Sequence, residues 1–213
     1  QPATRAALTG AAGGGKTALA RAAALAAAGK FSNGWVLDGF SPAAMLAGIQ
    51  QIAEDLRLQE VRPEEVARAV RVDLGRPERA GWLILLDNVE QAEAIPQLPD
   101  VLPTRGGCLV LITRHHDAAV TAEWPAVAVP RLTVPGALHL LLKGSAEPPE
   151  DPVLAKAAED VVDQLDRLPQ SIVMVRWVVR HTGWTWVQCS VRLAALRQRL
   201  VSDGQAHLLP AAV

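Results

Sequence analysis

Hydrophobic and polar positions follow two alternating patterns along the first two-thirds of the chain. Short apolar runs, two of them continuous through "WLILL" and "CLVLI", are typical of strands buried on both faces. Between these runs apolar residues recur at helical spacing, and Ser41 followed by Pro42 is a typical helix start. The predicted strands span residues 5–9, 34–38, 81–87, 106–114 and 124–130, and the predicted helices span 16–28, 43–56 and a segment after Pro63. This alternation predicts a parallel sheet with helices on both faces.

The pattern changes after Pro130, where no further strand-like run occurs. Four helical segments follow, separated by proline and glycine, and residues 145–152 are expected to form a solvated loop. The predicted helical segments span residues 134–144, 151–168, 169–183 and 185–204. We therefore expect two domains, an α/β domain over residues 1–130 and a small helical subdomain over residues 131–213.

Composition narrows the class of protein. Half of the 213 residues are hydrophobic, which is typical of a folded globular chain. The 21 basic and 22 acidic residues leave a net charge of -1, so we expect neither direct nucleic-acid binding nor attraction to an anionic membrane. No apolar stretch reaches the ~18 residues of a membrane span, and two distant cysteines favour a reducing, cytoplasmic location. Because the chain opens on Gln-Pro directly before the first strand, we expect it to be a piece of a longer protein.

The glycine cluster in "LTGAAGGGKTALA" satisfies the pattern G-x-x-x-x-G-K-[ST] at every fixed position. Glycines let successive backbone N–H groups point into one concavity, and the following helix adds its positive amino end. The alternative is a flexible loop in a sequence rich in small residues, but a strand before it and a helix after it favour a phosphate site. We assign nucleotide binding to Gly10, Gly13, Gly14, Gly15, Lys16, Thr17 and Ala18. Lys16 would reach the phosphates and the Thr17 hydroxyl would bind Mg²⁺.

A nucleotide site of this kind needs an acidic anchor for the metal, and Asp87 ends the buried run "LILLD". Parallel sheets bind ligands at the carboxyl ends of their strands, so Asp87 is expected to hold Mg²⁺; the alternative is a strand-terminal cap. The next residue is Asn88, which can orient a water molecule but cannot take its proton. We therefore expect slow hydrolysis. Glu90 is either a substitute base or a solvated residue at a helix start.

Thr113 and Arg114 end the run "LVLITR". If this strand lies beside the strand that precedes the glycine loop, one of these side chains would face the γ-phosphate. Arg114 is then expected to report the presence of that phosphate, and with Asp87 it forms the predicted catalytic pair. The alternative is an ordinary surface arginine.

Four stretches, taken in order, resemble the NB-ARC family within the STAND class of P-loop ATPases. They are "LTGAAGGGKTALA", "WLILLDNVEQ", "GCLVLITR" and "RLPQSI". The resemblance implies a three-layer α/β P-loop domain with a five-stranded, mainly parallel sheet, followed by a small helical subdomain. It also implies that Pro169 lies against the adenine and that Arg5 touches the base. Arg167 and Gln170 depart from the family pattern, which usually has glycine and leucine there.

By this resemblance the chain would be an ATP/ADP-binding molecular switch with slow ATPase activity and bound Mg²⁺. Exchange of ADP for ATP would permit homo-oligomerisation, and winged-helix, effector and sensor domains would lie elsewhere in the parent chain. One alternative is a motor or loader ATPase of the AAA+ type with rapid turnover. The other is a scaffold domain of a transcriptional regulator that does not turn over nucleotide.

Overall fold

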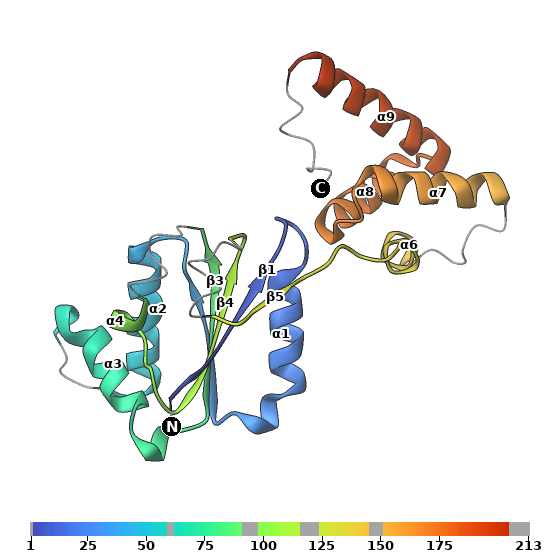
Figure 1. Ribbon diagram of the computed structural model, residues 1–213. Helices are drawn as coiled ribbons and strands as arrows, with labels where there is room; N and C mark the ends of the chain where they lie inside the picture. Colours follow the sequence, from blue (N-terminus) through green and yellow to red (C-terminus); the bar gives the residue numbers. More distant parts are fainter. Residues whose placement is uncertain (1, 59–61, 91–97, 116–123, 145–150, 205–213) are drawn as a thin grey trace. The chain divides into compact units, whose positions relative to one another are not determined.

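The computed structural model describes residues 2–58, 62–90, 98–115, 124–144 and 151–204 (Figure 1). The chain divides into two compact units. The α/β unit comprises Gln1–Ala12 and Lys16–Val129, and the helical unit comprises Gly13–Gly15 and Pro130–Val213. Each unit has a hydrophobic core of its own.

A five-stranded sheet forms the centre of the α/β unit, with strand order β2-β3-β4-β1-β5. Every pairing between these strands is parallel, which confirms the predicted parallel sheet. The strands are β1 (Thr4–Thr9), β2 (Asn33–Asp38), β3 (Trp82–Val89), β4 (Gly107–Thr113) and β5 (Ala126–Ala128). The last strand is shorter than predicted because Pro125 and Pro130 flank it, and proline cannot donate a hydrogen bond to a neighbouring strand.

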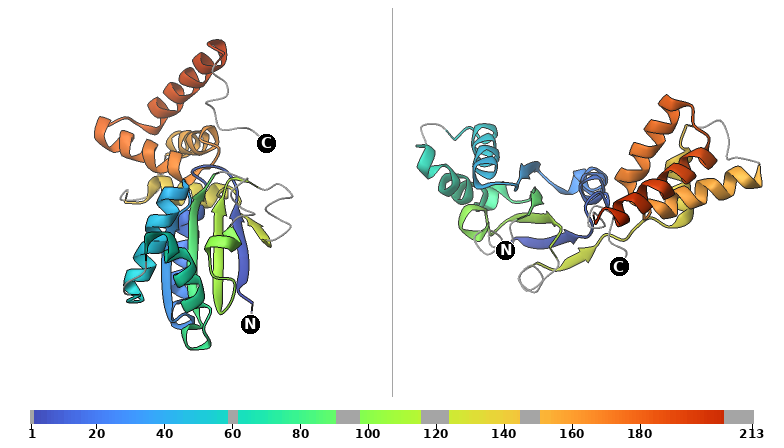
Figure 2. Two further views of the ribbon diagram at one scale, coloured as in Figure 1. Left: turned by 90° about the vertical axis from the view of Figure 1, so that its left-hand side faces the viewer. Right: turned by 90° about the horizontal axis from the view of Figure 1, so that it is seen from above.

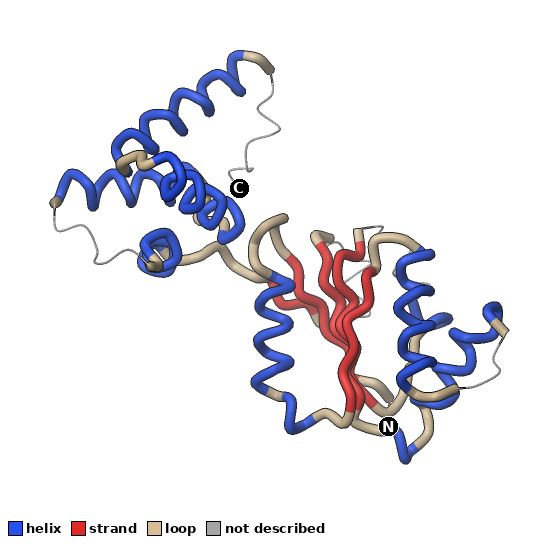
Figure 3. Tube along the Cα trace, turned by 180° about the vertical axis from the view of Figure 1, so that it is seen from behind, coloured by secondary structure: helices blue, strands red, loops and turns tan. Residues whose placement is uncertain are grey.

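Helices cover both faces of this sheet, so the unit has three layers. Helix α1 lies on one face, and α2, α3 and α4 lie on the other (Figure 3). Their bounds are α1 (Lys16–Ala26), α2 (Pro42–Asp55), α3 (Val66–Leu74) and α4 (Leu98–Val101), with 3-10 turns η1 (Ala28–Lys30), η2 (Pro63–Glu65) and η3 (Pro77–Arg79). The predicted start of α2 is confirmed, because the Ser41 hydroxyl accepts a hydrogen bond from the Ala44 N–H (3.2 Å). The first helix ends two residues earlier than predicted, since the chain continues as the η1 turn.

Strand β3 is buried on both faces, as its unbroken apolar run predicts. Ile84 and Leu86 belong to the larger core on the side of α2 and α3, whereas Leu83 and Leu85 pack with Ala20 of α1. Alternate residues of a strand point to opposite faces, so one apolar run supplies both layers of the core.

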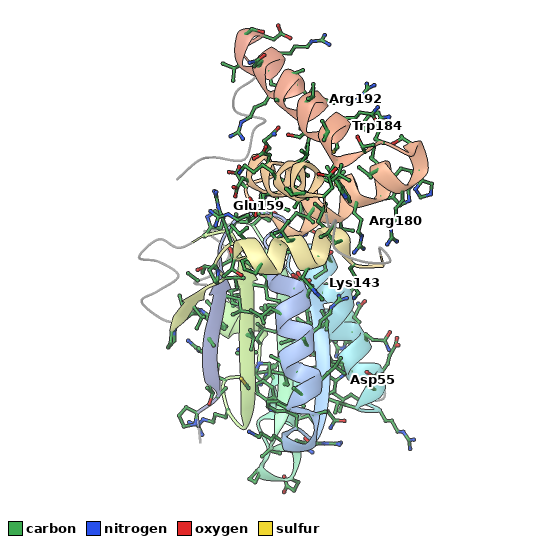
Figure 4. All side chains as sticks on the ribbon, turned by 90° about the vertical axis from the view of Figure 1, so that its right-hand side faces the viewer. Asp55, Lys143, Glu159, Arg180, Trp184 and Arg192 are labelled. Carbon is green, nitrogen blue, oxygen red and sulfur yellow. The ribbon has the colours of Figure 1, made fainter. Side chains whose placement is uncertain are left out.

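The helical unit is built from α6 (Val134–Leu142), α7 (Pro152–Gln164), α8 (Pro169–Thr182) and α9 (Trp186–Ser202) (Figure 2). Its core includes Leu141, Val161, Ile172 and Cys189. Helix α9 begins with a capping box, in which Thr185 and Gln188 satisfy each other's backbone N–H groups. The Arg192 guanidinium lies 4.4 Å from the centre of the Trp184 ring (Figure 4). None of the helices in the described parts of the chain is both long and apolar enough to cross a membrane.

Candidate functional site

The predicted phosphate loop connects β1, an interior strand of the sheet, to the first residue of α1. Gly10 has a φ of 135°, and a Cβ there would lie 3.0 Å from the Val129 carbonyl oxygen. Gly15, directly before α1, has a φ of 88°. Both positions therefore favour glycine, because other residues rarely adopt such φ values. Helix α1 begins directly after the loop, and the first backbone N–H groups of a helix have no partner within it. A loop that leads into such a helix end suits an anion.

Lys16 turns its side chain back over this loop. Its ammonium donates hydrogen bonds to the carbonyl oxygens of Gly10 and Ala11, both at 2.9 Å. Burial lowers the pKa of Lys16 and the positive charge of Arg114 lowers it further, whereas Asp87 and Glu90 act in the opposite direction. Three charged side chains from the ends of β3 and β4 thus lie close enough to act on the lysine.

Thr17 and Asp87, the two residues predicted to hold Mg²⁺, are in direct contact. The Thr17 hydroxyl donates a hydrogen bond to Asp87 Oδ1 at 2.8 Å, joining the first turn of α1 to β3. A hydroxyl and a carboxylate are hard oxygen ligands of the kind that Mg²⁺ prefers. Mg²⁺ is usually held by one or two protein ligands and takes the others from water and substrate phosphates, so this pair suits it. Within the described residues, no group of three or more histidine, cysteine, aspartate or glutamate side chains could hold a metal ion.

The end of β3 contains an irregularity that the sequence analysis did not predict. The register between β3 and β4 shifts between Leu86 and Val89, and Asn88 has a φ of 64°. Asparagine adopts this left-handed conformation more readily than most residues. Asn88 is exposed while Val89 is fully buried, so the shift changes which side chains face the core. The only sequence signal was the asparagine itself.

Beyond this bulge, three contacts join the end of β3 to the end of β4. The buried Thr113 hydroxyl donates to the Val89 carbonyl oxygen (2.6 Å), and the Glu90 carbonyl oxygen accepts a hydrogen bond from His115 Nε2 (2.5 Å). The Arg114 guanidinium forms an ion pair with the Glu90 carboxylate. Of the two residues considered as γ-phosphate sensors, Thr113 is buried with its hydroxyl bound to Val89, and Arg114 has an exposed side chain.

Three further predicted residues, outside the glycine loop, lie in different places. Ala18 is in the first turn of α1, and Pro169 is the first residue of α8 in the helical unit. Arg5 is near the start of β1, ~16 Å of strand before Gly10, and its guanidinium lies 5.5 Å from the centre of the Trp124 ring. The adenine contacts expected of Pro169 and Arg5 stay predictions.

Solved structures with a similar fold include two single-site variants of RuvB from Thermotoga maritima. They superpose with TM-scores of 0.51 and 0.52 at 15% and 14% sequence identity, over 95% of this chain. Together with the glycine loop between β1 and α1, this likeness decides the fold. The chain has a P-loop NTPase fold.

This P-loop chain spans 64% of the length of the RuvB chains. A STAND protein with a tetratricopeptide repeat sensor from Pyrococcus horikoshii also matches, at 16% identity over 78% of this chain and 26% of that protein, with a TM-score of 0.42. No family model matches the sequence, and no curated protein is significantly similar to it.

Proposed function

We propose that this chain is the ATP/ADP-binding switch domain of a STAND-class regulator of the NB-ARC type. The observation that carries the proposal is the site at the carboxyl end of the sheet, where Lys16 covers the glycine loop and Thr17 is paired with Asp87. The four ordered motifs of the sequence support the choice of class.

In this proposal each side chain has one task. The glycine loop and Lys16 bind the phosphates, and Thr17 and Asp87 hold Mg²⁺, which neutralises phosphate charge when bound. Arg114 contacts the γ-phosphate and so distinguishes ATP from ADP. Asn88, directly after Asp87, has no proton-accepting carboxylate, which supports slow hydrolysis. Such a site favours holding a nucleotide over turning it over.

The binding step is tested by thermal unfolding with Mg-ADP, Mg-ATP and Mg-GTP, after any co-purifying nucleotide has been removed. A ligand at ~100 times its dissociation constant stabilises a protein by about 2.7 kcal/mol, which gives a readily measured rise in Tm. We expect a rise with the adenine nucleotides, and we expect Lys16→Ala to abolish it. Lys30→Ala, an exposed lysine on the η1 turn, is the matched control and should keep the rise.

Two other outcomes would contradict the proposal. No rise in Tm with any nucleotide would favour a scaffold that does not use nucleotide. Steady turnover faster than about 1 s⁻¹, the low end for enzymes, would favour a motor or loader ATPase.

The switch itself requires that ATP and ADP give different assembly states. Light scattering on the parent protein with each nucleotide would test this homo-oligomerisation.

A further inference from the structure

We propose that Glu90 sets the preference of this site between nucleoside diphosphate and triphosphate by holding the guanidinium of Arg114. The inference rests on the proposed nucleotide-binding function and names a specificity-determining residue for it. In this inference the Glu90 carboxylate competes with the γ-phosphate for Arg114. Arg114 must leave the carboxylate before it can contact the phosphate.

The backbone on both sides of the Glu90–Arg114 ion pair is anchored. The Thr113 hydroxyl binds the carbonyl of Val89, and the ring of His115 binds the carbonyl of Glu90 itself. These contacts flank Arg114 on one strand and Glu90 on the other. An ordinary surface ion pair stabilises a protein only slightly, partly because two long side chains lose conformational entropy when it forms. Here the two backbones are already fixed close together, so less order is lost when the pair forms.

The bulge at Asn88 belongs to the same arrangement. Without a register shift, side chains along β3 would continue to alternate between the two faces of the sheet. The shift between Leu86 and Val89 breaks that alternation immediately before Glu90. Beyond this shift, the Glu90 carboxylate is the group that reaches Arg114.

Glu90 and Arg114 directly follow the carboxyl ends of β3 and β4, at the same edge of the parallel sheet where β1, the neighbour of β4, leads into the glycine loop. Lys16 is the residue that reaches the β- and γ-phosphates in loops of this pattern, and the charges of both Glu90 and Arg114 act on its ammonium. A γ-phosphate would therefore compete with Glu90 for the guanidinium. A diphosphate lacks the competing group and would leave the ion pair in place.

This competition has a definite thermodynamic consequence. Arg114 has two states, paired with Glu90 and unpaired. A ligand shifts the equilibrium between them only as far as its affinities for the two states differ. Triphosphate binding must break the ion pair, so the pair weakens triphosphate binding and leaves diphosphate binding unchanged. Glu90 would thereby bias the site toward ADP.

The test measures the dissociation constants of Mg-ADP and of a non-hydrolysable Mg-ATP analogue, by calorimetry on the 213-residue chain. Glu90→Gln keeps the shape of the side chain and removes its charge. We expect this variant to bind the triphosphate about 2- to 5-fold more tightly, the range expected for an exposed ion pair, with ADP affinity unchanged.

Arg114→Ala should weaken the binding of the triphosphate and leave the binding of ADP unchanged. Adding Glu90→Gln to Arg114→Ala should have no further effect on either affinity. Glu54→Gln, an exposed glutamate near the end of α2, is the matched control.

The inference would be overturned if Glu90→Gln left the ratio of the ADP and triphosphate dissociation constants unchanged. A purely structural residue would give this result, because its loss would lower Tm and change both affinities equally. An effect of Glu90→Gln that persists in the Arg114→Ala background would also overturn it. The proposed function fails separately, when neither nucleotide binds in a Lys16-dependent way.

Discussion

Asn88 and Arg167 are non-glycine residues with left-handed backbone, at φ values of 64° and 55°. The conformation is inexpensive for asparagine, whose short polar side chain tolerates it, and costs other residues roughly 1–2 kcal/mol. Arg167 lies in the turn between α7 and α8, where its N–H donates to the Val162 carbonyl oxygen (2.9 Å). The NB-ARC family, which the sequence resembles, usually has glycine at this position. The positive φ of Arg167 is a physical reason for that preference.

Replacing Arg167 by glycine should stabilise the chain, because glycine adopts this φ without steric cost. We expect an increase of up to about 1 kcal/mol in the free energy of unfolding of the helical unit, which contains Arg167, measured in urea. The substitution also removes the exposed Arg167–Asp163 ion pair (3.6 Å), which is worth little. Arg167→Ala is the control, since it removes the guanidinium but keeps the backbone strain. A less stable Arg167→Gly variant would contradict the argument.

The effect of a substitution at Asn88 on stability should depend on how well the new residue tolerates the positive φ of this position. Asn88→Gly is expected to leave the free energy of unfolding nearly unchanged, whereas Asn88→Val should lower it by about 1–2 kcal/mol, because a β-branched residue is strained there. The side chain is exposed, so lost packing does not complicate the comparison. Equal effects of the two substitutions would mean that the bulge can relax.

At the scale of elements, the pairing of β3 with β4 depends on one close approach. Trp82 is directly opposite Gly107, is fully buried, and donates its indole N–H to the Leu74 carbonyl oxygen (2.9 Å). A Cβ on Gly107 would overlap the indole ring. The ring thus fills the space that a side chain on β4 would occupy. This contact helps to fix β3 beside β4, and so places Asp87 on the strand next to Arg114.

Gly107→Ala should therefore destabilise the α/β unit. Overpacking of this kind typically costs about 1–3 kcal/mol, and the loss would appear as a lower midpoint in urea unfolding. Gly29→Ala is the matched control, because nothing lies within 4 Å of a Cβ at that position. It should be neutral or stabilise the chain by less than about 1 kcal/mol. Similar losses for both variants would show that the Trp82 contact is not the cause.

At the scale of the whole molecule, the buried core residues of the helical unit, among those that the structure describes, form a cluster separate from the core residues on the two faces of the sheet. Leu86 is fully buried in the core of the α/β unit, and Ile172 is fully buried in the core of the helical unit. Units with separate cores can unfold as separate cooperative steps. A single free energy of unfolding would then not describe the chain.

Calorimetry of two cavity variants tests this separation. Leu86→Ala and Ile172→Ala each remove a fully buried side chain, and such truncations cost about 2–5 kcal/mol. We expect each substitution to lower the temperature of a different thermal transition and to leave the other in place. If both variants lower one common transition by similar amounts, the two units unfold together.

Local patterns were sufficient to predict the five strands and most of the helices, whereas the short helix α4 and the 3-10 turns were not predicted. Continuous apolar runs indicated β3 and β4, the Ser41–Pro42 pair indicated the start of α2, and the glycine loop indicated a turn between a strand and a helix. The Thr17–Asp87 contact also followed, because carboxyl ends of parallel strands meet at one edge of a sheet. All of these depend on residues that are close in sequence or on a rule that holds for every parallel sheet.

The tertiary structure alone decided which strands are neighbours and what their ends contact. The sequence left open whether the strand ending at Thr113 lies beside β1; the structure pairs β4 with β1. It also set the bulge at Asn88, the pairing of Glu90 with Arg114, and the burial of Trp82 against Gly107. These features depend on register and packing between segments about 20 residues or more apart. The hydrophobic period of a single strand carries no information about such pairings.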